Sequence, residues 1–201
     1  MSRREQNKAG AYRAIHEAAY RLTVVEQAQP TVEEIAAAAQ VSPRTFFNYF
    51  RSKEEAVLGL RPAHIEEDQY THVGETKTSD LFEHVTEMFF EVIRSSVVDR
   101  STFYSRSQEL RELPLYRVVL AKHFGACEVL VQEAVSRHLA SESAPFDGSY
   151  TVEDAARALT VLAGAAAKFV FARYPAALTH DDDHEYRSSL AAFRTIIRET
   201  L

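Results

Sequence analysis

The sequence predicts an all-α protein, and three observations lead to that class. Glycine and proline are scarce, with 6 of each among 201 residues, whereas an all-β chain needs a turn signal roughly every 8–12 residues. Alanine-rich stretches such as EEIAAAAQ and LAGAAAKF favour helix through intrinsic propensity. Apolar residues also recur three and four positions apart along much of the chain. We expect about nine helices, with an N-terminal three-helix domain at residues 1–60 and a helical bundle at residues 61–201.

The composition is that of an ordinary folded protein, with 46% apolar and 26% charged residues. No apolar run approaches the roughly 18–20 residues that a membrane-spanning helix needs. The charged start, MSRREQNKAG, is not followed by the apolar segment of a secretory signal. A single cysteine excludes an intramolecular disulfide framework. We therefore expect a cytoplasmic protein that does not associate with membranes.

The net charge of −6 is unevenly divided along the chain. Residues 1–58 hold 8 Lys and Arg against 7 Asp and Glu, a net of +1, whereas residues 59–201 hold 15 against 22, a net of −7. A near-neutral N-terminal part with clustered basic residues, joined to an acidic body, is compatible with a nucleic-acid-binding head.

The first three predicted helices are short and closely punctuated. Helical spacing of apolar residues predicts a first helix over about residues 5–27. After Pro30, the segment TVEE reads as a capping box in which Thr31 and Glu34 bond reciprocally, opening a helix at 32–39. Ser42 and Pro43 then have the types preferred at the cap and first position of a helix at 43–50.

Further along, SKEE at 52–55 reads as a second capping box. The polar stretch from residue 63 to 79 has no usable period and reads as a loop or a poorly packed helix end. Longer amphipathic segments follow, at about residues 81–92, 101–110, 115–139, 151–173 and 183–200. SESAPFDGSY separates the third of these from the fourth, which Thr151 caps, and DDDH at 181–184 opens the last.

The second short helix carries an unusual surface. Phe46 and Phe50 lie four residues apart and face the first short helix as core. The opposite side carries Pro43, Arg44, Phe47, Asn48 and Tyr49, with Thr45 at its edge. A solvent-exposed helix face would ordinarily carry Glu and Lys instead. In a DNA major groove, Arg pairs with guanine, Asn with adenine, and Thr and Phe contact thymine methyl groups.

Residues 31–57, TVEEIAAAAQVSPRTFFNYFRSKEEAV, resemble the DNA-binding head of the TetR family of bacterial regulators. The resemblance implies a helix-turn-helix at about residues 32–51, with Lys53 holding a phosphate. It implies DNA contacts from Thr31, Pro43, Arg44, Thr45, Phe47, Asn48, Tyr49 and Lys53. The sequence departs from the family pattern at Gln40, where glycine is usual, at Phe47, often Tyr, and at Ala56, often Leu.

For the rest of the chain, the resemblance implies a helical body that binds a small-molecule effector and forms a homodimer. The body is rich in large apolar groups that could leave a ligand cavity, and the candidate ligand residues are Phe89, Phe103, Arg106, Phe124 and Phe169. Arg106 could meet an anionic head group or form a surface salt bridge. The pattern around residues 106–115 looks similar to a TetR subgroup with acyl-CoA-like ligands.

The dimer is expected to form through the two C-terminal helices. Small and apolar residues form a stripe on the first of them, namely Ala155, Ala158, Leu159, Leu162 and Ala166. A second stripe comprises Tyr186, Leu190, Phe193 and Ile197. Either stripe could instead pack on the core of its own chain.

These observations favour a repressor that binds a palindromic operator in double-stranded DNA as a homodimer and is released by a small, largely apolar ligand. Alternatives are a regulator without a ligand or acting through a protein partner and, more remotely, an enzyme on a helical scaffold. We expect no cofactor and no catalytic residues, since no phosphate loop or GxSxG motif is present. We also expect no metal site, with DDDH as a helix cap and Cys127 as a buried apolar residue.

Overall fold

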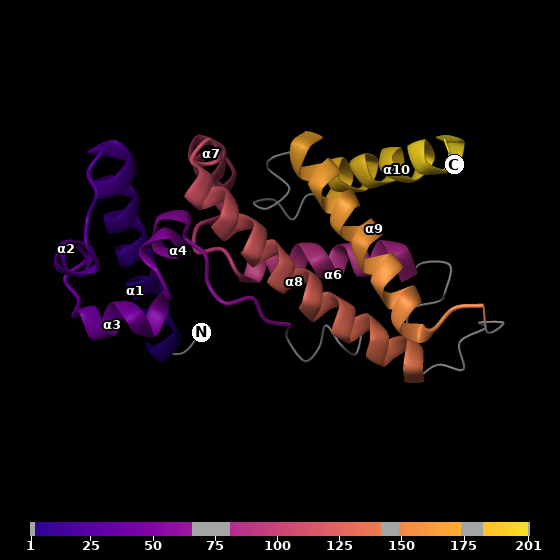
Figure 1. The fold of residues 1–201 in the computed structure, drawn as a ribbon, viewed down its shortest axis with the longest axis horizontal. Helices are drawn as coiled ribbons and strands as arrows, with labels where there is room; N and C mark the ends of the chain where they lie inside the picture. Colours follow the sequence, from indigo (N-terminus) through magenta and orange to yellow (C-terminus); the bar gives the residue numbers. More distant parts are fainter. Residues whose placement is uncertain (1–2, 66–80, 142–148, 174–182, 201) are drawn as a thin grey trace. The chain divides into compact units, whose positions relative to one another are not determined.

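The computed structural model describes residues 3–65, 81–141, 149–173 and 183–200. In these ranges the chain is helical and forms no strand, so the predicted all-α class is confirmed. Figure 1 labels the helices: α1 (Arg3–Tyr20), continued by a π-helical turn η1 (Arg21–Val25), α2 (Val32–Ala38), α3 (Pro43–Tyr49), α4 (Lys53–Leu58), α6 (Leu81–Ser95), α7 (Arg100–Leu110), α8 (Pro114–Ser141), α9 (Val152–Arg173) and α10 (Asp183–Thr200).

The chain divides into two compact units that do not follow chain order. The first unit comprises Met1–Pro62 and Ser96–His123, and the second comprises Ala63–Ser95 and Phe124–Leu201. Helix α7 and residues 114–123 of α8 therefore belong with the N-terminal helices. The functional boundary that we expect near residue 60 stays a prediction.

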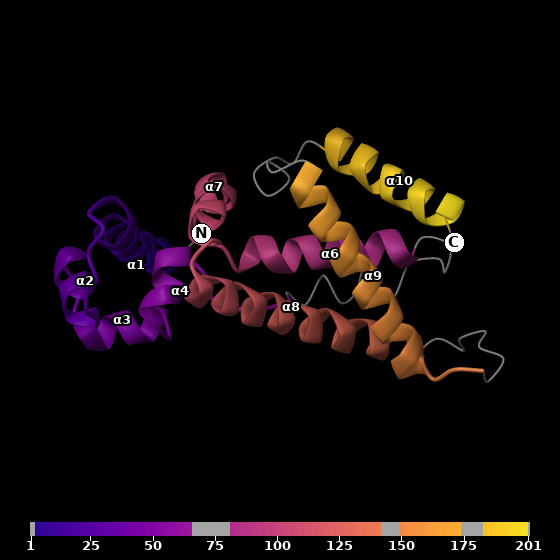
Figure 2. The same cartoon turned by 45° about the horizontal axis from the view of Figure 1, so that its top comes forward.

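In the first unit, α2 and α3 pack on each other and on α1, and α4 packs along α1 (Figure 2). Most of the side chains that meet there are apolar and almost fully buried, among them Ile15, Ile35, Phe46, Phe50 and Val57. The short helices predicted from their caps thus share one small hydrophobic core. Packing in this core fixes the positions of α2 and α3.

Within the same unit, the extended segment that follows α4 pairs with the extended segment that precedes α7. Leu60 and Val97 form an isolated antiparallel bridge. Beside it, the Arg61 amide donates to the Ser96 carbonyl at 2.7 Å, and the Val98 amide donates to the Gly59 carbonyl at 2.9 Å. The end of α4 is therefore tied through backbone hydrogen bonds to the start of α7.

A half-buried histidine, His123, lies beside this junction. The Ser96 hydroxyl and the His123 Nε2 atom lie 2.8 Å apart. Burial lowers the pKa of His123 to about 4, because a charged imidazolium loses more hydration than a neutral ring. The ring is therefore neutral at physiological pH.

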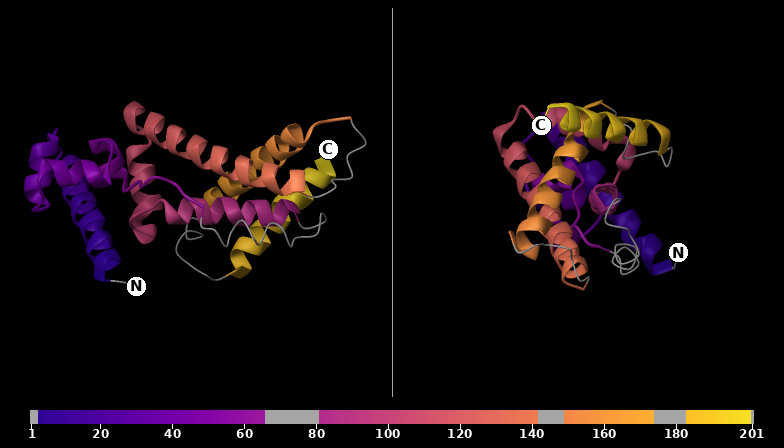
Figure 3. Two further views of the ribbon diagram at one scale, coloured as in Figure 1. Left: turned by 90° about the horizontal axis from the view of Figure 1, so that it is seen from below. Right: turned by 90° about the vertical axis from the view of Figure 1, so that its right-hand side faces the viewer.

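In the second unit, α9 packs across α6 and α10 packs on α9, as two further views show (Figure 3). The buried face of α9 is made mostly of alanines, which allow a close approach to the larger side chains of α6. A Cβ atom added at Gly164 would lie 3.6 Å from the Phe89 ring. Aromatic pairs join the helices, Phe90 with Phe171 at 4.7 Å between centroids and Phe169 with Phe193 at 5.7 Å.

Helix α8 contributes Cys127, Val131 and Val135 to this unit, all with no exposed surface. The predicted burial of Cys127 is thus confirmed. Thr151 caps α9 as predicted, because its hydroxyl accepts from the Asp154 amide at 3.1 Å. No helix in the described part of the chain is long and apolar enough to cross a membrane.

Several sequence-based expectations fall on residues that the structure does not describe. They concern residues 66–79 of the predicted polar segment, residues 142–148 of the predicted break, the first two aspartates of DDDH, and the side chain of Tyr186.

Candidate nucleic-acid interface

Side-chain caps define α2 and α3. The Glu34 amide donates to the Thr31 hydroxyl at 3.2 Å, while the Thr31 amide donates to the Glu34 carboxylate at 2.8 Å, which completes the predicted capping box. The Ser42 hydroxyl accepts from the Thr45 amide at 3.0 Å, and Pro43 occupies the first turn of α3. Both predicted helix starts are confirmed.

The turn between the two helices requires a left-handed residue. Gln40 has φ 58°, its amide donates to the Ala37 carbonyl at 3.1 Å, and the Val41 amide donates to the Ala36 carbonyl at 2.9 Å. This pair of bonds is a Schellman motif, in which the left-handed residue is usually glycine. The departure from glycine noted in the sequence therefore places a strained residue at the turn.

The predicted capping box at the start of α4 forms only in half. The Ser52 hydroxyl accepts from the Glu55 amide at 3.2 Å, as expected. The Glu55 carboxylate, however, accepts from the Arg51 amide at 3.0 Å instead of the Ser52 amide. Arg51 follows the end of α3, where Phe50 is extended, so its amide has no helical acceptor and takes the carboxylate.

The two faces of α3 differ as predicted. Phe46 and Phe50 are buried, with exposed fractions of 0% and 1%. On the other side Phe47 is 57% exposed. Pro43, Arg44 and Asn48 are also exposed, while Thr45 and Tyr49 are half-buried at the edges. The side chains predicted to read bases thus form one accessible surface.

Aromatic contacts hold α3 against α1. The Tyr12 ring meets the ring of Tyr49 edge-on at 4.7 Å and the ring of Phe50 edge-on at 5.4 Å. Arg61 lies over the Tyr12 ring at 5.4 Å from its centroid. Burial raises the pKa of Tyr12, although Arg61 acts in the opposite direction. Tyr12 of α1 therefore contributes to the orientation of α3, together with the core residues of α3 itself.

The two residues flanking the helix-turn-helix have protein partners. The Lys53 ammonium donates to the Pro30 carbonyl at 3.2 Å. Thr31 is occupied as the cap of α2. Both lie in the first unit together with α3, and their predicted DNA contacts stay predictions.

The candidate ligand residues do not form one cluster within either unit. Phe103 and Arg106 belong to the first unit, whereas Phe89, Phe124 and Phe169 belong to the second. Phe89 and Phe103 are buried, while Phe124 and Phe169 are half-buried. Arg106 forms an ion pair with Glu17 of α1, the salt bridge that we considered as the alternative to an anionic ligand.

Some of the candidate dimer residues are buried in the core of their own unit, and others are accessible. Ala166 and Leu190 are buried within their own unit, as the alternative interpretation expected. Ala155 and Leu159 are half-buried, and Ala158 is exposed. An open groove of about 510 Å³ is lined by Phe82, Leu162, Ala191, Phe193, Arg194, Thr195, Ile197 and Arg198. Three of the predicted interface residues therefore line one accessible apolar groove.

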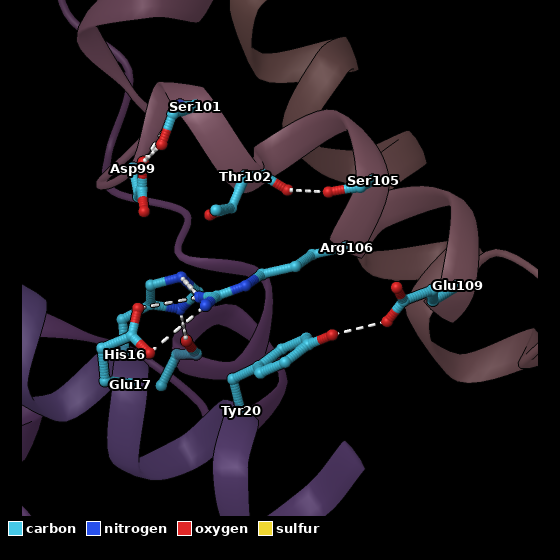
Figure 4. A network of polar contacts seen from close by, with 10 residues as sticks. His16, Glu17, Tyr20, Asp99, Ser101, Thr102, Ser105, Arg106 and Glu109 are labelled. Carbon is cyan, nitrogen blue, oxygen red and sulfur yellow. Dashed lines mark hydrogen bonds and ion pairs between the residues drawn. The ribbon is translucent and has the colours of Figure 1, made fainter. Parts of the chain in front are cut away.

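A polar network between α1 and α7 was not predicted (Figure 4). It joins His16, Glu17 and Tyr20 of α1 to Arg106 and Glu109 of α7. In the sequence, His16 lies within the apolar stripe of α1, which is a sign of burial but does not indicate a partner. The partners lie about 90 residues away, so no local spacing could have indicated them.

Comparison with known proteins bears on residues 11–58, which match the family model of bacterial regulatory proteins of the tetR family. The matched segment spans α1 to α4, including the capped pair α2 and α3. No curated protein matches the chain. The match supports a DNA-binding transcriptional regulator. Residues 11–58 thus form a helix-turn-helix domain of the TetR type.

Proposed function

We propose that the protein is a transcriptional repressor that binds a palindromic operator as a homodimer and is released by a small, largely apolar ligand. The observation that carries the DNA-binding part is the exposed surface of α3. Arg44, Phe47 and Asn48 project from a seven-residue helix whose opposite face is anchored by the buried Phe46 and Phe50. Such a rigid, accessible helix suits insertion into the major groove.

The side chains on this surface divide into two roles. Arg44 and Asn48 have the donors that pair with guanine and adenine edges, so they would select sequence. Lys53 lies at the start of α4, half-buried against the Pro30 carbonyl, and a point charge there would contact the phosphate backbone without reading bases. Phe47 would meet a thymine methyl group.

The test is a comparison of three alanine variants on duplexes selected from a random library by the wild-type protein. Arg44→Ala and Asn48→Ala should each relax base preference at one position per half-site by about 1–3 kcal/mol. Lys53→Ala should weaken binding to all sequences alike and reduce the salt slope by about 1 per half-site. Fluorescence anisotropy across a salt series measures both effects.

Lys168→Ala is the matched control, because it removes the same charge from an exposed position on α9. Its affinity and salt slope should equal those of the wild type. A uniform loss of affinity in all three head variants would contradict the division into base-reading and phosphate-binding residues. Absence of binding by the wild type, at low salt, would contradict the proposed function itself.

In this proposal, the second unit forms the homodimer and binds the effector. The groove lined by Leu162, Phe193 and Ile197 supports a contact between two copies, because it leaves apolar side chains of α9 and α10 accessible. Two recognition helices about 34–36 Å apart would then read the two halves of a palindrome. The resemblance to regulators of acyl-CoA-like ligands gains no support, since the family match ends at residue 58. The proposal assigns no catalytic residues.

A further inference from the structure

One arginine of α7 makes most of the polar contacts between α7 and α1 (Figure 4). The Arg106 Nη1 atom lies 2.8 Å from His16 Nε2 and 2.9 Å from Glu17 Oε1, and Nη2 lies 3.2 Å from Glu17 Oε2. The guanidinium also stacks over the Tyr20 ring, 4.1 Å from its centroid. The Tyr20 hydroxyl in turn donates to Glu109 on the next turn of α7. We call these contacts the α1–α7 clamp.

The two ring nitrogens of His16 have opposite roles in this clamp. His16 Nδ1 lies 2.8 Å from the Ala56 carbonyl oxygen of α4, which only accepts, so Nδ1 carries the proton. A guanidinium only donates, so Nε2 must accept from Arg106. Both contacts can be made only by a neutral ring protonated at Nδ1. A second proton on Nε2 would replace this hydrogen bond with two cations in contact.

The ring has little room to turn away from Arg106. Gly59, which ends α4 with φ 67°, packs against its face, and a Cβ added there would lie 2.9 Å from His16 Cε1. The ring thus lies between α4 and α7. A change of its charge must therefore be met by movement of Arg106 or of α1.

The surroundings of His16 include charges of both signs. On α1 it is flanked by Glu17 and Tyr20, from α4 it meets the Ala56 carbonyl, and from α7 it meets Arg106, with Asp99 at the start of that helix. Burial is the largest influence and lowers the pKa of His16, and Arg106 lowers it further. The Ala56 hydrogen bond, Glu17 and Asp99 raise it, without reversing the direction.

The clamp is connected to the recognition helix through α1. Tyr12, whose ring packs edge-on against Tyr49 and Phe50, precedes His16 by four residues and so lies one turn away on the same side of α1. We propose that Arg106 is a positioning residue for DNA binding, and that its bond to neutral His16 is a proton-sensitive clamp holding α1, and through it α3, in the binding geometry. The DNA part of this inference rests on the proposed function.

The sign of the expected pH effect separates this inference from ordinary electrostatics. Acidification adds positive charge to a protein, which by itself strengthens binding to DNA. The clamp predicts the reverse, because protonation of His16 expels Arg106 and frees α1. We expect operator affinity of the wild type to fall about tenfold between pH 7.5 and a pH one unit below the His16 midpoint measured by NMR, where most of the DNA-free protein carries the second proton.

The experiment uses the full chain and duplex DNA selected by the wild-type protein at neutral pH. His16→Gln keeps a neutral acceptor within reach of Arg106 but cannot be protonated, so its affinity should not fall on acidification. Arg106→Met should bind more weakly at neutral pH and lose the acid-induced fall. Arg106→Lys keeps the charge but loses the two-nitrogen pairing with Glu17 and the planar stacking on Tyr20, so it should rescue only part of the affinity. Circular dichroism at both pH values checks that each variant is folded.

A second measurement tests the clamp without DNA. Titration of His16 by NMR should show a higher pKa in Arg106→Met than in the wild type, because a neighbouring cation is removed. An unchanged His16 pKa would overturn the clamp. A raised pKa combined with equal affinities of wild type and His16→Gln at both pH values would overturn its role in positioning α3. If the wild type bound no DNA at any pH, the proposed function would fail while the NMR titration would still decide whether the clamp exists.

Discussion

Gln40 and Gly59 occupy equivalent positions at the ends of two helices. Both follow a helix with left-handed φ, 58° for Gln40 and 67° for Gly59, and both are followed by a residue whose amide bonds back five positions. A left-handed conformation costs a residue with a Cβ atom about 1–2 kcal/mol relative to glycine. We expect Gln40→Gly to raise the free energy of unfolding by about 1 kcal/mol, measured by urea denaturation.

The reverse change at the equivalent position supplies the control. Gly59→Ala should lower the free energy of unfolding by more than about 1 kcal/mol, because it adds the strain of φ 67° and places a Cβ atom 2.9 Å from the His16 ring. If Gln40→Gly were neutral or destabilising, the left-handed turn would carry no strain in Gln40.

His123 gives the stability of the protein a specific pH dependence. The pKa of His123 is about 4 in the folded chain, against about 6.5 in an unfolded one. The unfolded state therefore binds a proton more readily, so stability is complete above about pH 6.5 and falls as the pH drops toward 4. At pH 5 this histidine alone should cost about 2 kcal/mol of stability.

His123→Gln should remove that part of the acid sensitivity, since glutamine does not titrate but can still bond to the Ser96 hydroxyl. Urea midpoints of wild type and variant, compared at pH 7.5 and pH 5, give the difference. Equal losses of stability in both proteins on acidification would show that His123 is protonated as easily in the folded chain as in the unfolded one.

Among the helices, α3 depends strongly on its cap because it has only seven residues. The Ser42 hydroxyl satisfies the Thr45 amide and also pairs with the Thr45 hydroxyl at 2.8 Å. Ser42→Ala should destabilise the first unit by about 1 kcal/mol. Ser42→Asp, which retains a cap acceptor, should restore most of it. Hydrogen exchange of the α3 amides would measure this locally, and equal protection in Ser42→Ala and wild type would contradict the cap's contribution.

Helix boundaries in this protein could be read from the sequence where their determinants are local. Thr31 with Glu34 and Ser42 with Thr45 are separated by three residues, and both caps formed as predicted. The cap at Ser52 differed because Glu55 had a competing donor in Arg51, freed by the extended end of α3. That competition depends on where the previous helix stops, which sequence spacing alone does not determine.

The inward and outward faces of α3 were equally predictable, because Phe46 and Phe50 follow helical periodicity. The association of α7 with α1 was not, since Arg106 and His16 are about 90 residues apart and neither residue type specifies the other. The sequence left Arg106 with either an anionic ligand or a salt bridge, and its guanidinium is paired with Glu17, a partner that the sequence did not indicate. The chain order that suggested a boundary near residue 60 likewise contains no sign that residues 96–123 belong with the first unit.

For the whole molecule, dimerisation through α9 and α10 makes the most direct prediction. Leu162 is 39% exposed and lines the apolar groove with Phe193 and Ile197. Leu162→Glu should give a monomer with unchanged helical content, because the new carboxylate would be buried without a partner only in the dimer. Sedimentation velocity measures the mass, and the monomer should no longer bind a palindromic duplex.

Val129→Glu is the matched control, since Val129 is 57% exposed on α8 and its change adds the same charge. It should leave both the mass and the DNA affinity unchanged. Phe193→Glu tests the same groove from α10, although Phe193 also stacks on Phe82 and its loss should weaken the second unit. A Leu162→Glu protein that still sediments as a dimer would place the interface elsewhere.

The lone cysteine turns the packing of α8 into a built-in reporter of opening. Cys127 has no exposed surface and is the single thiol of the chain, so a thiol-specific reagent can reach it only when the surrounding helices separate. In native buffer, the rate of labelling divided by the rate for the unfolded chain gives the equilibrium constant of that opening. The free energy of opening follows from this constant, as it does from amide exchange at backbone sites. Candidate effectors could thus be screened without a dye, an operator or a second mutation, since a compound bound in the second unit would slow the reaction in proportion to its occupancy.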